Sequence, residues 1–131
     1  FEGRVILGDG VKIGANTISE FSVFGDGSRL TRQGGASLSV IYPNASIGGY
    51  LQLSLAGEGV TTKLWSAGYD MKVGAPVCVK TPHGLAAVDI GYQGVCLGHR
   101  VFVGSGVWIA PGRILEPARL ALRDPRNIIM K

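Results

Sequence analysis

The chain has 131 residues, of which 46% are hydrophobic and 21 are glycine, and its formal net charge is +4. This length supports one domain with a hydrophobic core, and the apolar content argues against a disordered chain. The glycines follow no three-residue period, which excludes a collagen-like chain, and no apolar stretch has the length of a membrane-spanning helix.

A six-residue repeat runs through residues 5–17, whose sequence is VILGDGVKIGANT. A period of six fits neither an α-helix nor an amphipathic strand, but it is typical of short parallel strands bent at regular corners. Leu7 and Ile13 are expected to point inward, and Lys12 between two inward residues is expected to point outward. The alternative, a β-sandwich with glycine-rich turns, predicts turn signals every 8–12 residues instead.

Further along the chain the repeat is interrupted and resumes several times. It weakens after residue 22, returns at 45–53 and 71–79, and runs almost unbroken from 88 to 115. Interruptions of a solenoid map to loops, which often lie on the binding face. We therefore expect one all-β solenoid domain over residues 1–131, with about four coils and with loops near 25–43, 57–70 and 81–87.

The C-terminal repeats carry large outward residues. Leu97, Val103 and Ile109 take inward positions, whereas Phe102 and Trp108 lie six residues apart at outward positions, which predicts that they share one face. An exposed tryptophan is costly unless covered, so Trp108 indicates a subunit interface, a covering loop or, alternatively, a surface that stacks on adenine. The tail after residue 115 contains two prolines and is expected to be a strand or a capping turn.

Charge and cysteine content narrow the possible partners. Positive charge gathers towards the C-terminal end, which suits either an anionic ligand such as a nucleotide phosphate or a solvated rim. A basic stripe with interleaved aromatics is missing from the sequence, so a nucleic-acid partner is not expected. Cys78 and Cys96 cannot form a disulfide framework and are interpreted as free thiols of a reducing, cytoplasmic compartment.

The repeat resembles the hexapeptide repeat of bacterial acyltransferases, whose fold is a left-handed parallel β-helix with three strands per coil. Segments 57–62 (GEGVTT) and 101–105 (VFVGS) are similar to the C-terminal domain of sugar-1-phosphate nucleotidyltransferase/acetyltransferases. The resemblance implies a homotrimer that binds acetyl-coenzyme A or another acyl-coenzyme A between subunits. It also implies a sugar or sugar-nucleotide acceptor, and it assigns Gly104, Ser105 and Ala110 to the cofactor groove.

The chain departs from this family at three positions. Gln52 stands where the family has its catalytic histidine, and glutamine cannot act as a general base at neutral pH. Leu64 and Trp65 replace the family's asparagine–tyrosine pair.

Acyl transfer needs a base near the attacking atom, and the sequence holds only two histidines. His83 lies in the segment TPHGLA, which could project across a subunit boundary, and is the candidate catalytic residue. His99 lies at a corner beside Arg100, and either histidine is as readily a surface residue. Two histidines at this spacing do not predict a zinc site of the type with three protein ligands, so no metal is expected.

Two functions follow from these residues. The first is an acyl-coenzyme A-dependent transferase domain with a sugar or sugar-nucleotide acceptor. The second is a non-catalytic domain that trimerises or regulates a sugar-phosphate nucleotidyltransferase. Because the chain opens on Phe1 and enters the repeat by residue 5, it is expected to be the C-terminal part of a longer protein.

Overall fold

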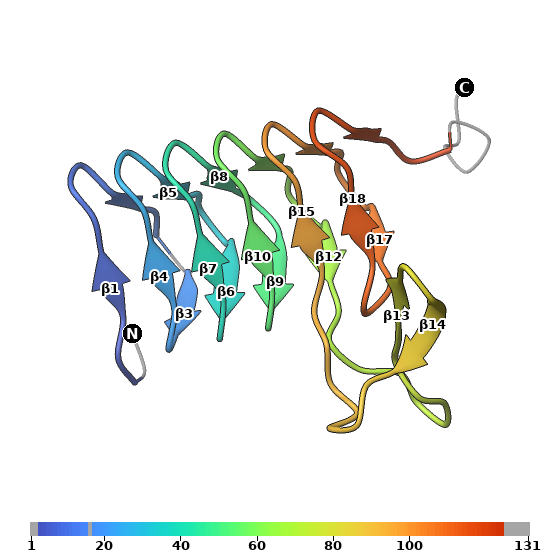
Figure 1. The fold of residues 1–131 in the computed structure, drawn as a ribbon. Coiled ribbons are helices and arrows are strands. Elements are labelled where there is room, and N and C mark those ends of the chain that lie inside the picture. Colours follow the sequence, from blue (N-terminus) through green and yellow to red (C-terminus); the bar gives the residue numbers. More distant parts are fainter. Residues whose placement is uncertain (1–2, 16, 125–131) are drawn as a thin grey trace.

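The computed structural model describes residues 3–15 and 17–124, and in those ranges every regular element is a β-strand. The strands stack in parallel on three sheets, which we call the first, second and third faces (Figure 1). The first face holds β1 (Ile6–Leu7), β4 (Val23–Phe24), β7 (Val40–Ile41), β10 (Leu55–Ala56), β15 (Cys96–Leu97) and β18 (Ile114–Leu115). The second face holds β2 (Lys12–Ile13), β5 (Arg29–Leu30), β8 (Ser46–Ile47), β11 (Thr61–Thr62), β16 (Phe102–Val103) and β19 (Leu120–Ala121). The third face holds β3 (Ile18–Glu20), β6 (Gly35–Ser37), β9 (Tyr50–Gln52), β12 (Ala67–Gly68) and β17 (Trp108–Ile109).

The chain visits the three faces in turn and so forms a three-sided parallel β-helix. Across the described residues it completes five coils and adds β18 and β19 of a sixth, more than the four coils expected. The all-β solenoid architecture predicted from the six-residue repeat is confirmed. We number the corners by the face that precedes them, so the first corner joins the first and second faces.

The core is a set of side-chain stacks that run along the solenoid axis. The inward positions Leu97, Val103 and Ile109 are buried as predicted, and the outward Trp108 is exposed. Leu7 also occupies an inward position, but it is 47% exposed because the described residues include no coil before β1 to cover it. Stacked aliphatic side chains on successive coils supply most of the hydrophobic stabilisation.

Coil length differs from the eighteen residues that three hexapeptides would give. On the first face the register partners of successive coils are 17, 17, 15, 41 and 18 residues apart; these partners are Ile6, Val23, Val40, Leu55, Cys96 and Ile114. Each seventeen-residue coil is one residue short of eighteen because its strand on the third face has three residues instead of two, while its third corner has two residues instead of four. Phe21–Ser22 and Leu38–Ser39 are two-residue corners, in which Phe21 and Leu38 adopt φ of 42° and 49°.

Buried serines connect these short third corners. The backbone N–H of Ser39 donates to Ser22 Oγ over 3.1 Å, and that of Ser54 donates to Ser39 Oγ over 3.1 Å. The N–H of Val95 continues the series by donating to Ser54 Oγ over 3.0 Å. Each hydroxyl in turn donates to the carbonyl two residues earlier in its own coil. We call Ser22, Ser39 and Ser54 the serine ladder.

Two of the three expected loops are wrong. Residues 25–43 contain β5, β6 and β7, and residues 57–70 contain β11 and β12. The repeat was hidden there because serine and alanine fill inward positions, as the buried Ser28 and Ala36 show, and because the short third corners shift its phase. A polar side chain at a core position gives no hydrophobic signal to a pattern search.

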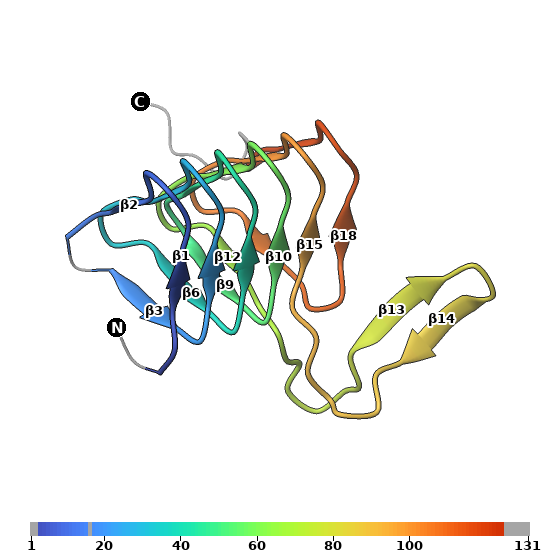
Figure 2. The same cartoon turned by 60° about the vertical axis from the view of Figure 1, so that its left-hand side comes forward.

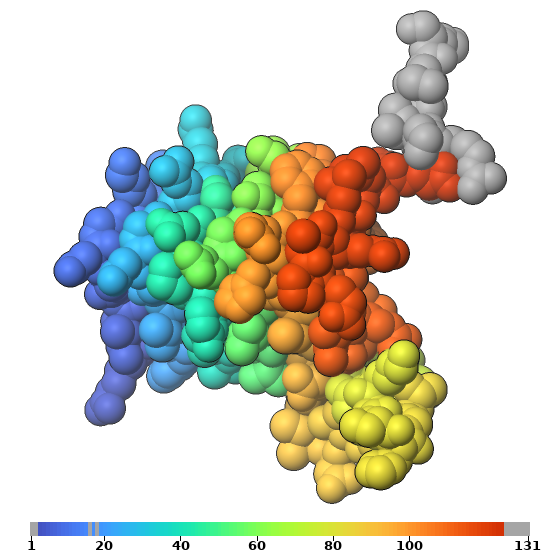
Figure 3. Space-filling view, turned by 45° about the horizontal axis from the view of Figure 1, so that its top comes forward, coloured from blue at the N-terminus to red at the C-terminus, as the bar shows by residue number. Residues whose placement is uncertain are grey.

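The main insertion lies between β12 and β15, and it includes the third expected loop, 81–87. It carries an antiparallel hairpin of β13 (Cys78–Thr81) and β14 (Gly84–Ala87). Figure 2 shows this hairpin standing clear of the stacked coils, and the space-filling view in Figure 3 shows it as a lobe beside the last coils. The insertion therefore leaves the solenoid at a third corner and returns to the same corner.

Phe102 and Trp108 do not share a face, contrary to the sequence expectation. Phe102 lies on β16 of the second face and Trp108 on β17 of the third face. Six residues take the chain from one face of the solenoid to the next, so outward side chains six residues apart point in different directions. Residues on the same face are separated by a whole coil.

Candidate functional site in the second corner

The second corner of the third coil is shortened to two residues. Gly48 and Gly49 alone join β8 to β9, whereas residues 31–34, 63–66 and 104–107 form four-residue corners in other coils. The corners on either side therefore protrude beyond Gly48–Gly49. The recess between them is a hollow of about 290 Å³, which we call the glycine notch.

The floor of the glycine notch is fixed by the neighbouring coil. Thr62 Oγ1 accepts hydrogen bonds from the backbone N–H groups of both Gly48 and Gly49, each over 3.1 Å. A Cβ at Gly49 would overlap Ser66, and one at Gly48 would lie 2.7 Å from the Thr62 carbonyl oxygen. Only glycine allows the backbone to approach this closely, so the recess is set by the chain itself.

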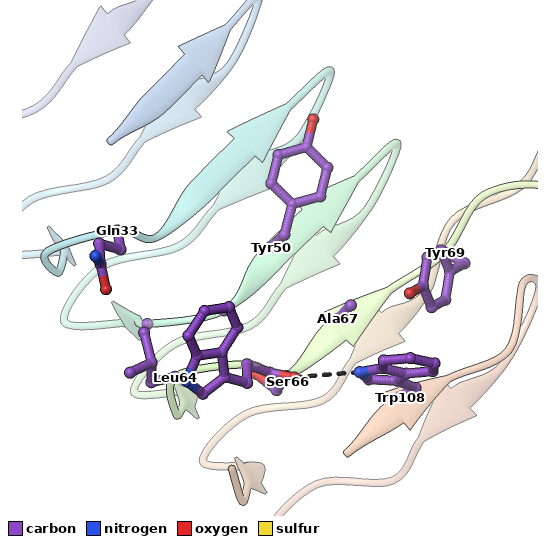
Figure 4. A pocket seen from close by; sticks show the side chains of 10 residues that line it. Gln33, Tyr50, Leu64, Ser66, Ala67, Tyr69 and Trp108 are labelled. Atoms are coloured by element: carbon purple, nitrogen blue, oxygen red, sulfur yellow. Dashed lines mark hydrogen bonds between the residues drawn. The ribbon is translucent and has the colours of Figure 1, made fainter. Parts of the chain in front are cut away.

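Aromatic side chains wall the notch. Figure 4 shows Gln33 at one end and Trp108 at the other, with Leu64 and Ser66 between them, and Trp65 also lines the notch. Trp108 Nε1 donates to the Trp65 carbonyl oxygen over 3.2 Å, and Tyr69 packs edge-on against the Trp108 ring at 5.9 Å. Trp65 and Trp108 are nonetheless 73% and 70% exposed. Two fixed contacts thus hold the Trp108 ring in place while most of its surface stays open.

Trp65 adopts a backbone conformation that is unfavourable for a bulky residue. Its φ is 64°, and the corresponding position of the next coil is occupied by Gly106 with φ of 70°. A left-handed conformation costs an L-residue about 1–2 kcal/mol. Gln33, at the corresponding position of the corner 31–34, also has φ of 64°, so the left-handed conformation belongs to the four-residue corner itself.

A second hollow of about 410 Å³ adjoins the notch, and we call it the arginine hollow. It is lined by Gly106 and Arg123 together with Trp65 and Trp108, the two residues that it shares with the glycine notch. The Arg123 guanidinium gives the arginine hollow a positive charge, whereas the residues that line the notch are all uncharged. Anionic groups are therefore favoured on one side of the tryptophans and not on the other.

Two acidic side chains, Glu20 and Asp70, act on Tyr50, which lines the notch. Burial raises the pKa of the Tyr50 phenol, and the carboxylates of Glu20 and Asp70 raise it further, against an opposing hydrogen bond with Ser37. Ser37 also donates to Glu20 Oε2 over 3.0 Å. Tyr50 therefore remains neutral at physiological pH and keeps its hydroxyl proton for donation.

The predicted cofactor residues divide between two corners. Gly104 and Ser105 lie in the same second corner as Gly106, at the edge of the arginine hollow. Ala110 lies at the opposite end of β17, in a third corner, and lines neither hollow. None of the three lines either hollow, so their assignment to a cofactor groove stays a prediction.

The two histidines lie away from the tryptophans. His83 is exposed in the turn of the β13–β14 hairpin, where its backbone N–H donates to Thr81 Oγ1. His99 lies in a first corner, where its Nδ1 accepts the N–H of Glu58 over 2.9 Å and its ring meets Tyr42 edge-on. Neither histidine lines the glycine notch or the arginine hollow.

Sequence reasoning missed the notch and Tyr50, and it considered Arg123 only as one of the positive charges that gather towards the C-terminal end. The signal was the pair Gly48–Gly49, because two glycines directly after an inward isoleucine remove the corner that the repeat demands. That shortening also shifts the inward position to Leu51, while Leu53 becomes a corner residue with φ of 48°. The family departures at Leu64 and Trp65 fall on the notch wall itself. No spacing rule links Arg123 to Trp108, because stacking of a later coil brings them together.

The described residues contain no cluster of three or more histidine, cysteine or acidic side chains that would hold a metal ion. Within the same ranges, no helix is long and apolar enough to span a membrane. Cys78 and Cys96 are free and half-buried.

The fold is a β-solenoid domain with two adjoining hollows at its second corners. No family model matches the chain. In sequence it is 29% identical over 146 residues to the bifunctional protein GlmU of Marinobacter nauticus, an alignment that covers 92% of this chain and 31% of that protein. Among solved structures, serine acetyltransferase isoform 3 of Entamoeba histolytica, in complex with cysteine, is 14% identical with a TM-score of 0.37. That match covers 97% of this chain and 36% of the other.

The chain thus spans about a third of the length of each relative. The six-residue repeat and the three-sided parallel solenoid fit the hexapeptide-repeat superfamily, and the chain is similar in sequence to GlmU.

Proposed function

We propose that this domain transfers an acyl group from acyl-coenzyme A to a sugar or sugar-nucleotide acceptor. The observation that carries the proposal is the pair of adjoining hollows that share Trp65 and Trp108. One hollow has a guanidinium and the other is uncharged, so two chemically different ligands can meet at the tryptophans. Two adjoining sites are what a transfer reaction between two substrates requires.

The residues of the arginine hollow suit an acyl-coenzyme A. The Arg123 guanidinium would pair with phosphate oxygens, and an exposed indole would stack on the adenine. Gly106 has no side chain to block an extended ligand from the backbone. The bound cofactor supplies an acyl group as a thioester, and transfer to an acceptor hydroxyl or amine releases the thiol.

His83 is the proposed general base. A neutral imidazole there would take the proton of the attacking hydroxyl or amine and pass it on to the leaving thiolate, so that charge and protons balance. Because the hairpin stands clear of its own coils, we propose that it reaches the groove of a neighbouring copy in a homotrimer (Figure 2). The outward residues of the first face support association, since they are apolar across all six strands: Ile6, Val23, Val40, Leu55, Cys96 and Ile114. A reducing, cytoplasmic compartment is part of the same proposal, supported by the two free cysteines.

A non-catalytic role is the second candidate. The observation that favours it is that no histidine lines either hollow in the described part of the chain. The domain would then keep the solenoid for trimerisation or regulation of a sugar-phosphate nucleotidyltransferase.

Calorimetric titration with acetyl-coenzyme A, combined with a mass measurement in the same buffer, tests the proposal. We expect a trimer that binds the cofactor, and about tenfold weaker binding for Arg123→Gln through loss of a charge-assisted contact. Arg113→Gln is the matched control, because it removes the same charge from an exposed third-corner position outside both hollows. A trimer that does not bind the cofactor would favour the non-catalytic role. For turnover, His83→Ala is expected to abolish transfer and leave the trimer intact, and undiminished turnover would remove His83 from the mechanism.

A further inference from the structure

We propose that the glycine notch binds the ring of an uncharged pyranose, held face-on against the tryptophans. That this ring belongs to the acyl acceptor rests on the proposed function, whereas the existence of a ring site rests on the notch alone. The proposed ligand is an uncharged sugar rather than a sugar phosphate, because the uncharged lining of the notch disfavours an anion.

The shape of the notch is the first argument. It exists because the third coil is two residues shorter in its second corner than the coils on either side. Its floor is tied to Thr62 by two hydrogen bonds and leaves no room for a Cβ at Gly49. A volume of about 290 Å³ is close to the lower limit for small-molecule sites in proteins. The recess is thus rigid, preformed and of a size that suits a single ring.

The tryptophans are the second argument. Trp108 is anchored by its Nε1–H and by Tyr69, and the exposed Trp65 indole lines the notch beside it. The face of an indole ring is electronegative, so it attracts the weakly positive C–H groups on one face of a pyranose. Placing a hydrocarbon face there also removes exposed aromatic surface from water.

Charge is the third argument. The hollow itself has no cationic lining residue, while Glu20 and Asp70 act on Tyr50 from the third face. A phosphate in the notch would lose hydration without gaining a counter-charge, which is unfavourable. The polar groups available are neutral: the Gln33 amide and the Tyr50 and Tyr69 hydroxyls suit the hydroxyls of a sugar.

Ligand-observed saturation-transfer NMR on the intact protein tests this inference. The probes are methyl α-D-glucopyranoside, glucose 1-phosphate and adenosine, and acetyl-coenzyme A is titrated in parallel by calorimetry. Ala67→Leu fills the notch from β12, because Ala67 points outward between its register partners Tyr50 and Trp108. Gln33→Ala removes a notch amide at a residue that does not line the arginine hollow.

We expect the pyranoside to bind the wild-type protein, and to bind about tenfold more weakly to Ala67→Leu and several-fold more weakly to Gln33→Ala. Arg123→Gln should leave pyranoside binding unchanged while it weakens binding of the cofactor. Absence of a pyranoside signal, equal or stronger binding of glucose 1-phosphate, or competition by adenosine for the same site would each overturn the inference. If the pyranoside binds as expected and acetyl-coenzyme A does not, the ring site stands and the proposed transferase function fails.

Discussion

The second and third corners of this solenoid are built on opposite principles. The third corners of the first three coils all have two residues, end in serine and are joined by the buried serine ladder. The second corners vary in length, one of them carries the exposed Trp65, and the two hollows lie along them. Uniform corners stack and bury their polar groups, whereas a corner that differs from its neighbours leaves a recess. Irregularity in a repeat protein therefore marks where a ligand can enter.

The largest effect is expected from closing the recess at Gly49. Gly49→Ala places a Cβ against Ser66 and should lower the free energy of unfolding by about 3 kcal/mol, because backbone must move. Chemical denaturation measures the change. Gly104→Ala is the control in another second corner, where the nearest atom to the new Cβ is the end of Leu122 at 3.1 Å and the nearest backbone atom is at an ordinary contact distance of 3.4 Å, and it should cost less than about 1 kcal/mol. Equal losses in the two variants would contradict a rigid notch floor.

Breaking the serine ladder should have the next largest effect. Ser39→Ala leaves the buried N–H of Ser54 without its acceptor, and we expect a loss of about 2 kcal/mol in the free energy of unfolding. Faster amide hydrogen exchange at Ser54 would accompany it. Ser105→Ala, at an exposed second-corner position, should change stability by less than about 0.5 kcal/mol. A Ser39→Ala protein as stable as this control would show that the ladder does not stabilise the third corners.

The variant Trp65→Gly tests whether the Trp65 indole contributes to the stability of the fold or faces a ligand. Trp65→Gly removes the left-handed penalty of about 1–2 kcal/mol but restores freedom to the unfolded chain, so stability should change by less than about 1 kcal/mol. Thermal unfolding measures this, with Ala118→Gly as a control at φ of 59° in a first corner. If Trp65→Gly were more than about 2 kcal/mol less stable than Ala118→Gly, the indole would be a structural rather than a ligand-facing group.

The smallest effect concerns the pH dependence of stability through Tyr50. Its pKa is raised above the ordinary value of 10.0 in the folded protein, first by burial and then by Glu20 and Asp70. The folded state therefore holds the phenol proton more tightly than the unfolded state does. This contribution is complete below pH 10 and is lost as pH rises through the folded-state pKa. Thermal melts between about pH 9 and pH 11.5 should fall less steeply for Tyr50→Phe than for the wild type, and parallel curves would contradict the shift.

Much of the architecture could be predicted from the sequence. The clear repeats at 5–17 and 95–110 predicted parallel stacking, the inward positions of Leu97 and Val103, and the all-β class. The repeat between 25 and 43 was missed, because Ser28 and Ala36 in the core resemble loop residues in a pattern search. The three serines of the ladder accept hydrogen bonds from the next coil, whereas Ser28 Oγ is buried without a hydrogen-bond partner in the described residues, and a linear sequence displays neither.

The candidate site was only partly predictable. The sequence drew attention to Ser105 and Trp108, and the structure brings both to the arginine hollow or its edge. It gave no reason to join Arg123 or Tyr50 to them, since these residues lie in other coils. Spacing along the chain specifies neighbours within one coil, whereas the number of residues in each corner decides which side chains align between coils.

The sequence by itself determined the period, the parallel stacking and the inward side chains of the clear repeats, because a hexapeptide repeat can bury its aliphatic residues in few other ways. Only the tertiary structure decided where the repeat fails to stack. The loss of two residues at Gly48–Gly49 has little effect on the core. It leaves this corner recessed between neighbouring second corners that protrude. A cavity arises from the difference between successive coils, and that difference becomes visible only once the coils are superposed in register.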